Sequence, residues 1–541
     1  MRWVPLVFVF GGMLCAQEAP QTGTIHGIVT DEATGLPMRD VPVLVLQRRE
    51  LQGNLLLIPR SRAVTDAEGK YTIANVPPGT PQVDVRAAKR DVVSHNVTVR
   101  AGQDVEMNFS VPPNPEISGR VLDEDRKPVK GASVWLVQSS YNSGMLRRTQ
   151  VGYHATSAED GRFLFEENLE AGRKYYLLAK GPTGVPTYYG GSTSFDAAPP
   201  VVLARGEQRE QVNIVSRQAA TRCVDGTVKA GGKPLSTELT VEQSALAGSG
   251  IAFAPPVESA ADGTFRACGL AAGDYTISGP DNHFHDERPF TIAESDMRGI
   301  ELNLDPAMIR REFVWDGDPP AEAAEEPAAA DSATDESPSP PNIADMTDVQ
   351  FRKRLGLPIG REVTLSVGRV PFRGKIPYSD TAPVATSAGD LPIMVQLAPG
   401  CYVKEITYGG VPVTDGMLHL TAATSATLRI VAAQGGGTIS AKVEDGDGHP
   451  VGGAGVVIVP EGVETAAQFA GAAHPGIADL GGNFTSGTLA PGKYRVLALT
   501  HPYQATEEEI AKLLALLPSA QKVEVGRSGN VRVTLGTIAM E

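Results

Sequence analysis

The sequence predicts an all-β chain, a tandem array of about five antiparallel Greek-key β-sandwich modules with one short helix near the C-terminus. The 541 residues are too many for one hydrophobic core, since a domain usually holds about 100 to 200 residues. The 58 Gly and 41 Pro are typical of short strands joined by turns. A unit of strands and turns also recurs along the chain, which indicates repeated modules.

Each copy of the unit opens with an alternating apolar strand. The copies read IHGIV from residue 25, ISGRV from 117, VDGTV from 224 and ISAKV from 439, with a degraded copy, REFVW, from 311. Gly27, Gly119 and Gly226 hold the same inner position in the first three copies. A glycine inside a strand marks a place where another backbone comes close, so we expect a neighbouring strand to approach there.

A later pair of strands has a fixed gap. Two glycines stand ten or eleven residues apart in every copy: Gly69 and Gly79, Gly161 and Gly172, Gly263 and Gly273, Gly389 and Gly400, and Gly482 and Gly492. The first glycine permits a turn with positive φ, and the aromatic residue or Leu after it packs inward. The tyrosines that follow the second glycine, Tyr275, Tyr402 and Tyr494 among them, are expected to anchor the next strand rather than to bind a ligand.

These repeats divide the chain into modules. Module one covers residues 22–112, module two 115–216, module three 220–305, module four 307–432 and module five 436–541. Residues 316–345 are rich in Ala, Pro and acidic residues and are predicted to be disordered. They are either a linker or a long loop inside module four. The opener REFVW favours the loop, and it predicts that residues 313–315 pair with strands near 363–367 or beyond.

One helix is predicted over residues 506–517. The segment EEEIAKLLALL has an acidic first turn and an apolar stripe, and it ends at Pro518. We expect this helix to dock on the sandwich of module five.

The first sixteen residues are typical of a secretory signal peptide. Arg2 precedes an apolar run over 4–14, and the segment closes on Ala16. The run is shorter than the ~20 apolar residues of a membrane-spanning helix. Cys15 leaves a lipoprotein as the alternative, but Leu14 stands where such signals carry Gly, Ala or Ser. The mature chain is therefore expected to be secreted, periplasmic or on the cell surface, without a transmembrane segment.

The charge distribution argues against nucleic acid as a partner. The net charge is -15, and residues 316–345 contribute nine acidic residues and no Lys or Arg. Phosphate binding needs a concentrated basic stripe, and none is evident in the sequence.

The order of motifs resembles that of the carboxypeptidase regulatory-like domain. The shared pattern is a strand with GxV, a hairpin with GAxVxL, then DGxF and xxLxPGxY, and it covers nearly the whole mature chain, most weakly module four. The resemblance implies a prealbumin-like, carbohydrate-binding-like sandwich that is an appendage in metallocarboxypeptidases. None of the nine His has Glu at the third following position, so the zinc motif of such enzymes is missing. No catalytic residue, metal or cofactor is predicted.

The predicted function is that of an exported, non-catalytic scaffold or binding protein of the cell envelope. Candidate partners are polysaccharide or other envelope proteins. The alternatives are a specific polysaccharide-recognition protein and a hydrolase whose site the sequence does not reveal.

Three aromatic residues are candidates for ligand binding, because carbohydrate sites need exposed aromatic rings. Tyr188 and Tyr189 lie in the Gly-flanked segment PTYYGGSTSF, where a ring has little core to join. Trp135 faces away from Val134 and Leu136, which are expected to point inward. Packing over the edge of a module is the alternative for all three.

Cys223 and Cys268 occur only in module three, and they are predicted to form a disulfide. Two unpaired buried thiols are the alternative. Cys401 is then alone in the mature chain and is expected to be buried beside Tyr402.

Three polar segments raise the question of a metal. Residues 281–287, DNHFHDE, carry two His among acidic residues, and the turns that begin at Asp123 and Asp445 are rich in Asp. None has a complete set of ligands at fixed spacing. A solvated loop and ordinary turns are therefore expected.

Overall fold

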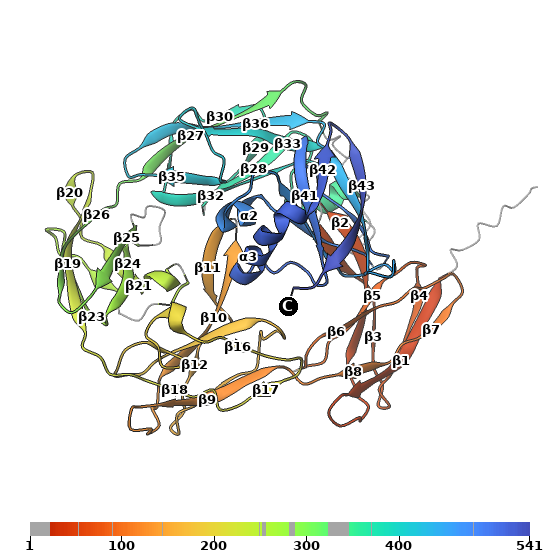
Figure 1. Cartoon of the computed structure of the whole chain (residues 1–541), viewed down its shortest axis with the longest axis horizontal. Helices are drawn as coiled ribbons and strands as arrows, with labels where there is room; N and C mark the ends of the chain where they lie inside the picture. Colours follow the sequence, from red (N-terminus) through yellow and green to blue (C-terminus); the bar gives the residue numbers. More distant parts are fainter. Residues whose placement is uncertain are drawn as a thin grey trace, which may run out of the picture. The chain divides into compact units, whose positions relative to one another are not determined.

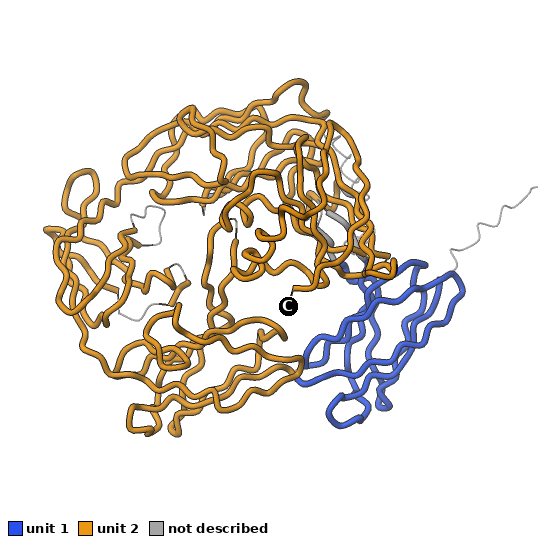
Figure 2. Tube along the Cα trace, viewed as in Figure 1, with its two compact units in different colours: residues 1–48, 57–113 blue, residues 49–56, 114–541 orange. Residues whose placement is uncertain are grey.

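The computed structural model describes residues 22–540, apart from 52–53, 89, 143, 248, 252–255, 281–286, 323–345, 369 and 480. The predicted signal peptide, residues 1–16, lies outside the described residues. The chain divides into two compact units, one of Met1–Arg48 and Leu57–Pro113 and one of Arg49–Leu56 and Asn114–Glu541 (Figure 2). Each unit is described by itself.

The prediction of an all-β chain is confirmed. The described residues form 43 strands in nine sheets, with only three short α-helices (Figure 1). None of these helices is long and apolar enough to cross a membrane. In every module the first strand pairs in parallel with the last strand, while most other pairs are antiparallel.

The first unit is the sandwich of module one. One sheet contains β1 (Gly23–Asp31), β4 (Lys70–Val76), β7 (Asp104–Glu106) and β8 (Phe109–Val111). The other contains β2 (Pro42–Leu51), β3 (Asn54–Val64), β5 (Gln82–Val85) and β6 (Val93–Asn96). Ile25, Tyr71 and Phe109 from the first sheet meet Val43 and Val83 from the second in one buried core.

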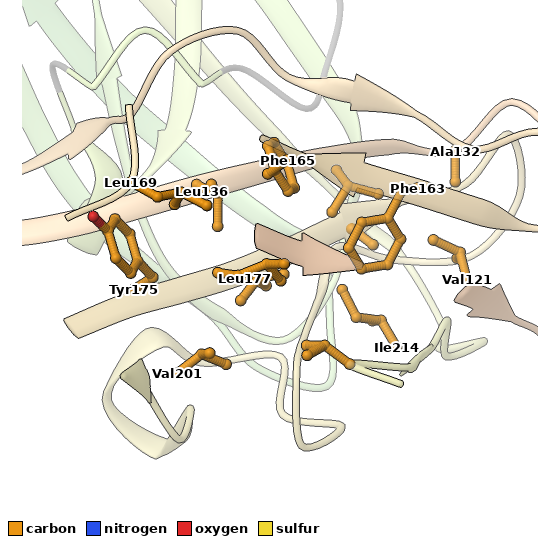
Figure 3. Close-up of a cluster of buried hydrophobic side chains, with 14 of the residues drawn as sticks. Val121, Ala132, Leu136, Phe163, Phe165, Leu169, Tyr175, Leu177, Val201 and Ile214 are labelled. Carbon is orange, nitrogen blue, oxygen red and sulfur yellow. The ribbon is translucent and has the colours of Figure 1, made fainter. Parts of the chain in front are cut away.

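Module two begins the second unit. Its first sheet contains β9 (Glu116–Leu122), β13 (Arg162–Phe165), β17 (Gln208–Arg209) and β18 (Ile214–Val215). Its second contains β10 (Ser133–Asn142), β11 (Met145–Gln150), β12 (Ala155–Thr156), β14 (Lys174–Lys180), β15 (Thr187–Tyr188) and β16 (Val201–Val202). Figure 3 shows the core between them, where Leu136 and Leu177 lie with Phe163 and Tyr175.

Module three repeats this plan. Its sheets contain β19 (Arg222–Ala230), β20 (Lys233–Pro234), β23 (Thr264–Leu270) and β26 (Met297–Asn303), and β21 (Glu238–Gln243), β22 (Val257–Glu258), β24 (Gly273–Ser278) and β25 (Glu287–Ile292). Tyr275, one of the repeated tyrosines, is buried in the core with Phe265 and Phe290, which agrees with a structural role.

Module four also has two sheets. The first contains β27 (Ala307–Asp316), β30 (Tyr378–Ser379), β31 (Val384–Thr386), β33 (Cys401–Tyr408), β34 (Val411–Pro412) and β36 (Ser425–Gln434). The second contains β28 (Glu362–Val367), β29 (Val370–Lys375), β32 (Gly389–Leu397) and β35 (Met417–Leu420). A short helix, α1 (Asp348–Arg354), precedes β28 and begins at a capping box of Thr347 and Gln350.

Residues 313–315 were predicted to pair with strands near 363–367 or beyond. They do not pair with 363–367, but they do pair with strands further along the chain. Phe313 pairs with Tyr378 of β30 and with Ile430 of β36. Strand β28 belongs to the other sheet, so Phe313 and Val363 meet in the core instead. Strands β27 and β36, which precede and follow residues 323–345 in the sequence, thus lie side by side.

In module five the strands join in one sheet. It contains β37 (Thr438–Glu444), β38 (Gly455–Pro460), β39 (His474–Ile477), β40 (Asn483–Thr485), β41 (Gly492–Leu499), β42 (Gln521–Val525) and β43 (Asn530–Ile538). The predicted helix is confirmed as α3 (Glu507–Leu516), and its Ile510 and Leu513 are buried. A further helix that we did not predict, α2 (Ala466–Ala472), begins at a capping box of Thr465 and Gln468.

The expected close approach at the opener glycines is present. A Cβ on Gly27 would lie 1.8 Å from the carbonyl oxygen of Met107, and a Cβ on Gly119 would lie 2.1 Å from that of Val212. In both modules the last strand is interrupted at this point, between β7 and β8 and between β17 and β18. In module five, β43 pairs without interruption and the same position holds Ala441. In module three a Cβ on Gly226 would lie 2.3 Å from the carbonyl oxygen of Ile300, where β26 is continuous but its register against β19 shifts. The glycine therefore goes with an irregularity in the pairing of the last strand, either an interruption or a register shift.

Candidate functional site

Tyr188 does not have the exposed ring that a ligand site needs, so the expectation is wrong for this residue. It ends strand β15 and has no exposed surface. Its hydroxyl donates a hydrogen bond to Oε1 of Gln243 at 3.0 Å, and its ring packs edge-on against Phe195. Leu246 of module three is part of the same buried cluster. Tyr188 thus joins modules two and three, and burial raises the pKa of its phenol.

Trp135 is half-buried, and its indole also packs against this cluster of modules two and three. Its ring centroid lies 5.8 Å from that of His154. The packing alternative therefore describes Trp135 better than a free platform for a sugar ring.

Tyr189 differs from its neighbour. It is half-buried, packs against the core of module two, and also lines an open groove on the surface of that module. Gly190 and Gly191 follow it with φ angles of 86° and 85°, so the chain reverses directly after the ring. One part of the tyrosine is fixed by the core while another part faces the groove.

Five polar side chains line the groove with Tyr189. They come from three separate segments of module two and the residue that follows it: Glu124, Arg126, Arg209, Asn213 and Arg217. Glu124 and Arg126 lie on the turn after β9, and Arg126 has a positive φ of 64°. Arg209 ends β17, and Asn213 and Arg217 lie on either side of β18 near the end of the module. We did not predict these residues, because no short motif connects them in the sequence.

Two of the arginines have close neighbours. Nε of Arg209 donates to Oε1 of Glu207 at 2.6 Å, and Glu207 in turn accepts the backbone N–H of Ala204 at 2.7 Å. Arg217 lies over Gly191, where a Cβ would come within 3.4 Å of its Nη2. The groove therefore presents one guanidinium group held by its neighbours, that of Arg209, and two exposed ones, those of Arg126 and Arg217, beside an aromatic ring. This arrangement suits anionic and polar ligands.

A second cleft, of about 460 Å³, lies between modules four and five. Cys401, Tyr402, His474 and Tyr494 are in its lining. Cys401 is buried, as expected, and burial raises the pKa of its thiol. A raised pKa disfavours the thiolate, which is the nucleophilic form, so this cleft lacks the electrostatics of a cysteine nucleophile.

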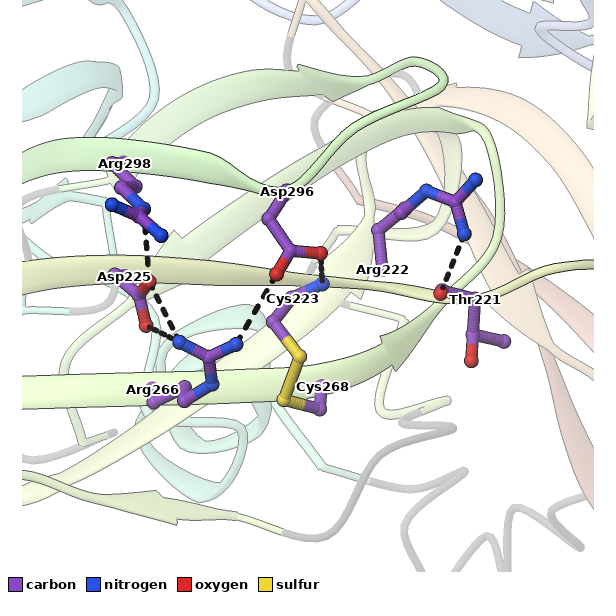
Figure 4. Close-up of a disulfide and its surroundings, with 8 residues drawn as sticks. All are labelled: Thr221, Arg222, Cys223, Asp225, Arg266, Cys268, Asp296 and Arg298. Carbon is purple, nitrogen blue, oxygen red and sulfur yellow. Dashed lines mark hydrogen bonds and ion pairs between the residues drawn. A yellow bond between two sulfur atoms is a disulfide. The ribbon is translucent and has the colours of Figure 1, made fainter.

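The predicted partners Cys223 and Cys268 are joined by a disulfide in the structure. It links adjacent strands β19 and β23, at positions that pair directly across the sheet. Figure 4 shows the charged side chains that surround it, including Arg266 and Asp296.

The two Asp-rich turns, which the structure describes, do not form a buried metal site. Of the 281–287 segment, residues 281–286 lie outside the described residues. Asp445, Asp447 and His449 bring one ligand atom each within 4.8 Å of one another, but all three are exposed. Oδ1 of Asp445 accepts the backbone N–H groups of Asp447 and His449, which is ordinary turn chemistry. At the turn after β9, Oδ1 of Asp123 accepts the N–H of Lys127 in the same way.

Comparison with known families identifies module one. The family model of the carboxypeptidase regulatory-like domain matches residues 24–112. This match confirms the resemblance for the first module. No curated protein matches the sequence.

Among solved structures, similar chains include three bacterial proteins. The Bacillus anthracis TIE protein is 14% identical, with 52% of this chain and 51% of that chain covered and a TM-score of 0.16. The streptococcal ancillary pilin is 15% identical, with coverages of 52% and 99% and a TM-score of 0.19. BcpA, the major pilin subunit of Bacillus cereus, is 13% identical, with coverages of 59% and 99% and a TM-score of 0.15. The chain thus spans about half the length of the first of these, and TM-scores this low carry no argument about function.

Proposed function

We propose that this protein is an exported, non-catalytic scaffold in which modules two to five are docked into one unit and module two presents a binding groove. The observation that carries the proposal is the contact between modules two and five. The hairpin of β10 and β11 lies against α2 and α3, and its Tyr141 packs with Phe469 and Ile510 of module five. Such contacts hold the two modules at a fixed spacing, which supports a scaffold role.

Polar contacts tie the same surfaces together. The backbone N–H of Tyr141 donates to the carbonyl of Ala505 at 2.8 Å. Oγ of Ser139 donates to Oε2 of Glu507 at 3.1 Å, and Lys174 forms an ion pair with Glu508. Apolar packing together with directed hydrogen bonds supports one relative orientation of the two modules.

A role as a polysaccharide-recognition protein is the second candidate, and the groove beside Tyr189 favours it.

A hydrolase has less support. Glycosidases use a pair of carboxylates, whereas Glu124 is the single carboxylate among the described residues that line the groove.

Export is tested by the N-terminus of the mature protein. When the full chain is produced in a bacterium with a general secretion pathway, we expect cleavage after Ala16 and a mature chain that begins at Gln17, because residues 2–16 have the pattern of a signal peptide. Intact mass spectrometry of the exported fraction measures this. An uncleaved chain retained in the cytoplasm would contradict export, and a lipid-modified chain that begins at Cys15 would replace soluble export by membrane anchoring.

A further inference from the structure

The groove on module two differs in charge from the protein as a whole. Three arginines, Arg126, Arg209 and Arg217, line it with one carboxylate, Glu124, so its lining has a formal charge of +2. The complete chain has a net charge of -15. A positive groove on an acidic protein attracts an anionic ligand locally while the rest of the surface repels it, which directs the ligand to this place.

Two of the arginines keep their donors available. Within the described part of the chain, the guanidinium groups of Arg126 and Arg217 form no hydrogen bond or ion pair, and both side chains belong to exposed residues. Arg209 uses Nε for Glu207 and Nη2 for the carbonyl of Val202 at 3.4 Å, which leaves Nη1 for a ligand. A guanidinium fits a carboxylate with two parallel hydrogen bonds, so Arg126 and Arg217 each offer such a position.

The other groups suit a ligand that carries hydroxyl groups as well as negative charge. Oδ1 of Asn213 accepts the backbone N–H of Arg120 at 2.9 Å, so the amide NH2 is the part of Asn213 that a ligand can use as a donor. Glu124 supplies acceptors. Sugar hydroxyls can donate hydrogen bonds to these carboxylate oxygens.

Tyr189 adds an apolar surface. Its packing against the module core fixes the ring, so that little side-chain entropy is lost when a ligand covers the part that faces the groove. A sugar ring has an apolar face of C–H groups that can lie on an aromatic ring, and its hydroxyls then reach polar groups at the sides.

We infer that this groove binds an acidic polysaccharide, with uronate carboxylates on Arg126, Arg209 and Arg217 and a sugar ring against Tyr189. The inference rests on the proposed role as an extracellular binding scaffold and specifies its ligand. It requires no covalent step.

The test uses the full chain and polygalacturonate as the probe, with isothermal titration calorimetry at low salt. We expect binding by the unchanged protein, and about tenfold weaker binding for Arg217→Ala, because a hydrogen-bonded charge pair is lost. Arg205→Ala is the matched control, since Arg205 is an exposed arginine of the same module that does not line the groove. Its affinity should equal that of the unchanged protein.

Two further measurements test whether the ring of Tyr189 and the carboxylate charge of the ligand contribute to binding. Tyr189→Ala should weaken the binding of polygalacturonate as well. Because this change also removes a ring that packs on the core, the circular dichroism spectrum of the variant must match that of the unchanged protein. Fully methyl-esterified polygalacturonate should bind at least tenfold more weakly, because the ester removes the charge that the arginines recognise.

Four results would overturn the inference, and three of them concern polygalacturonate itself. These are no binding of polygalacturonate, equal loss in Arg217→Ala and Arg205→Ala, or equal affinity for the esterified polymer. Equal affinity for dextran sulfate would also overturn it, because the groove would then select charge alone. Each of these outcomes leaves the scaffold role standing, since export and module docking are measured separately.

Discussion

Replacing Asp380 by alanine is expected to destabilise module four by about 3 to 5 kcal/mol, because it leaves a buried guanidinium without its partner. Oδ2 of Asp380 accepts Nε of Arg311 at 2.8 Å and the backbone N–H of the same residue at 2.7 Å. Oδ1 accepts Nη2 of Arg311 at 3.0 Å. The two side chains are only 11% and 5% exposed, so water cannot replace the lost bonds. Arg311 also lies over the ring of Phe372.

Hydrogen exchange of the full chain measures this effect in β27 and β30, the strands that carry or adjoin the pair. Asp316→Ala is the matched control. Asp316 pairs with Lys404 in the same module, but both side chains are well exposed, so its removal should leave protection nearly unchanged. Equal protection in Asp380→Ala and Asp316→Ala would show that the buried pair contributes nothing.

The same pair has a defined pH dependence. Burial alone would raise the pKa of Asp380, but the hydrogen bonds and the charge of Arg311 outweigh it and lower the pKa below its ordinary value of 3.8. A carboxyl group whose pKa is lower in the folded state stabilises fully above its unfolded pKa and loses that contribution as the pH falls through the folded value. Protection of β27 by this pair should therefore persist at pH 5 and disappear only in stronger acid.

Removing the disulfide with Cys223→Ser and Cys268→Ser is expected to lower the free energy of unfolding of module three by about 4 kcal/mol in the chain-entropy model. The reason is that the unfolded chain gains the conformational freedom of the loop that the disulfide closes. The cysteines are 45 residues apart. Cys268 is an exposed residue, so a reductant should reach the bond. Differential scanning calorimetry should therefore show that reduction lowers the unfolding temperature of this module in the unchanged protein and has no further effect in the double variant.

Ion pairs on the same strands should preserve part of the structure without the disulfide. Nη1 of Arg266 contacts both oxygens of Asp225 at 2.9 Å, and Nη2 reaches Asp296 at 3.2 Å (Figure 4). Cys401→Ser is the control, because that thiol is buried in module four and forms no disulfide. Identical calorimetric traces of the unchanged protein with and without reductant would contradict a stabilising bond.

The repeated elements of the fold could be predicted because their signals are local. Alternating strands, the glycine at Gly27 and the acidic first turn of α3 each depend on a few neighbouring residues. The short helix α2 was missed, since AAQFAGA has no long apolar stripe and only the capping box of Thr465 and Gln468 marks its start. The partner of Phe313 could be narrowed only to residues 363–367 or strands beyond them, because the sequence does not tell which of two facing sheets a strand joins.

The candidate site was predicted less well than the fold. Tyr189 lines a groove, and ligand binding by it stays a prediction. Tyr188 is covered by module three, whose Leu246 is 58 positions further along the sequence. Arg126 and Arg217 come together only when the first and last strands of module two pair in parallel. Neither contact leaves a short-range pattern.

The most direct test of the docked scaffold is a cross-link between modules two and five. A Cβ on Gly144 would lie 3.5 Å from Cα of Gly471, and a Cβ on Gly471 would lie 3.6 Å from Cα of Gly144, which is close enough for a disulfide. The full chain with Gly144→Cys and Gly471→Cys, oxidised under mild conditions and digested for mass spectrometry, should yield the linked peptide in most molecules, while either change alone should not. Free thiols at both positions in the folded double variant would show that the two modules are not docked, and would contradict the scaffold.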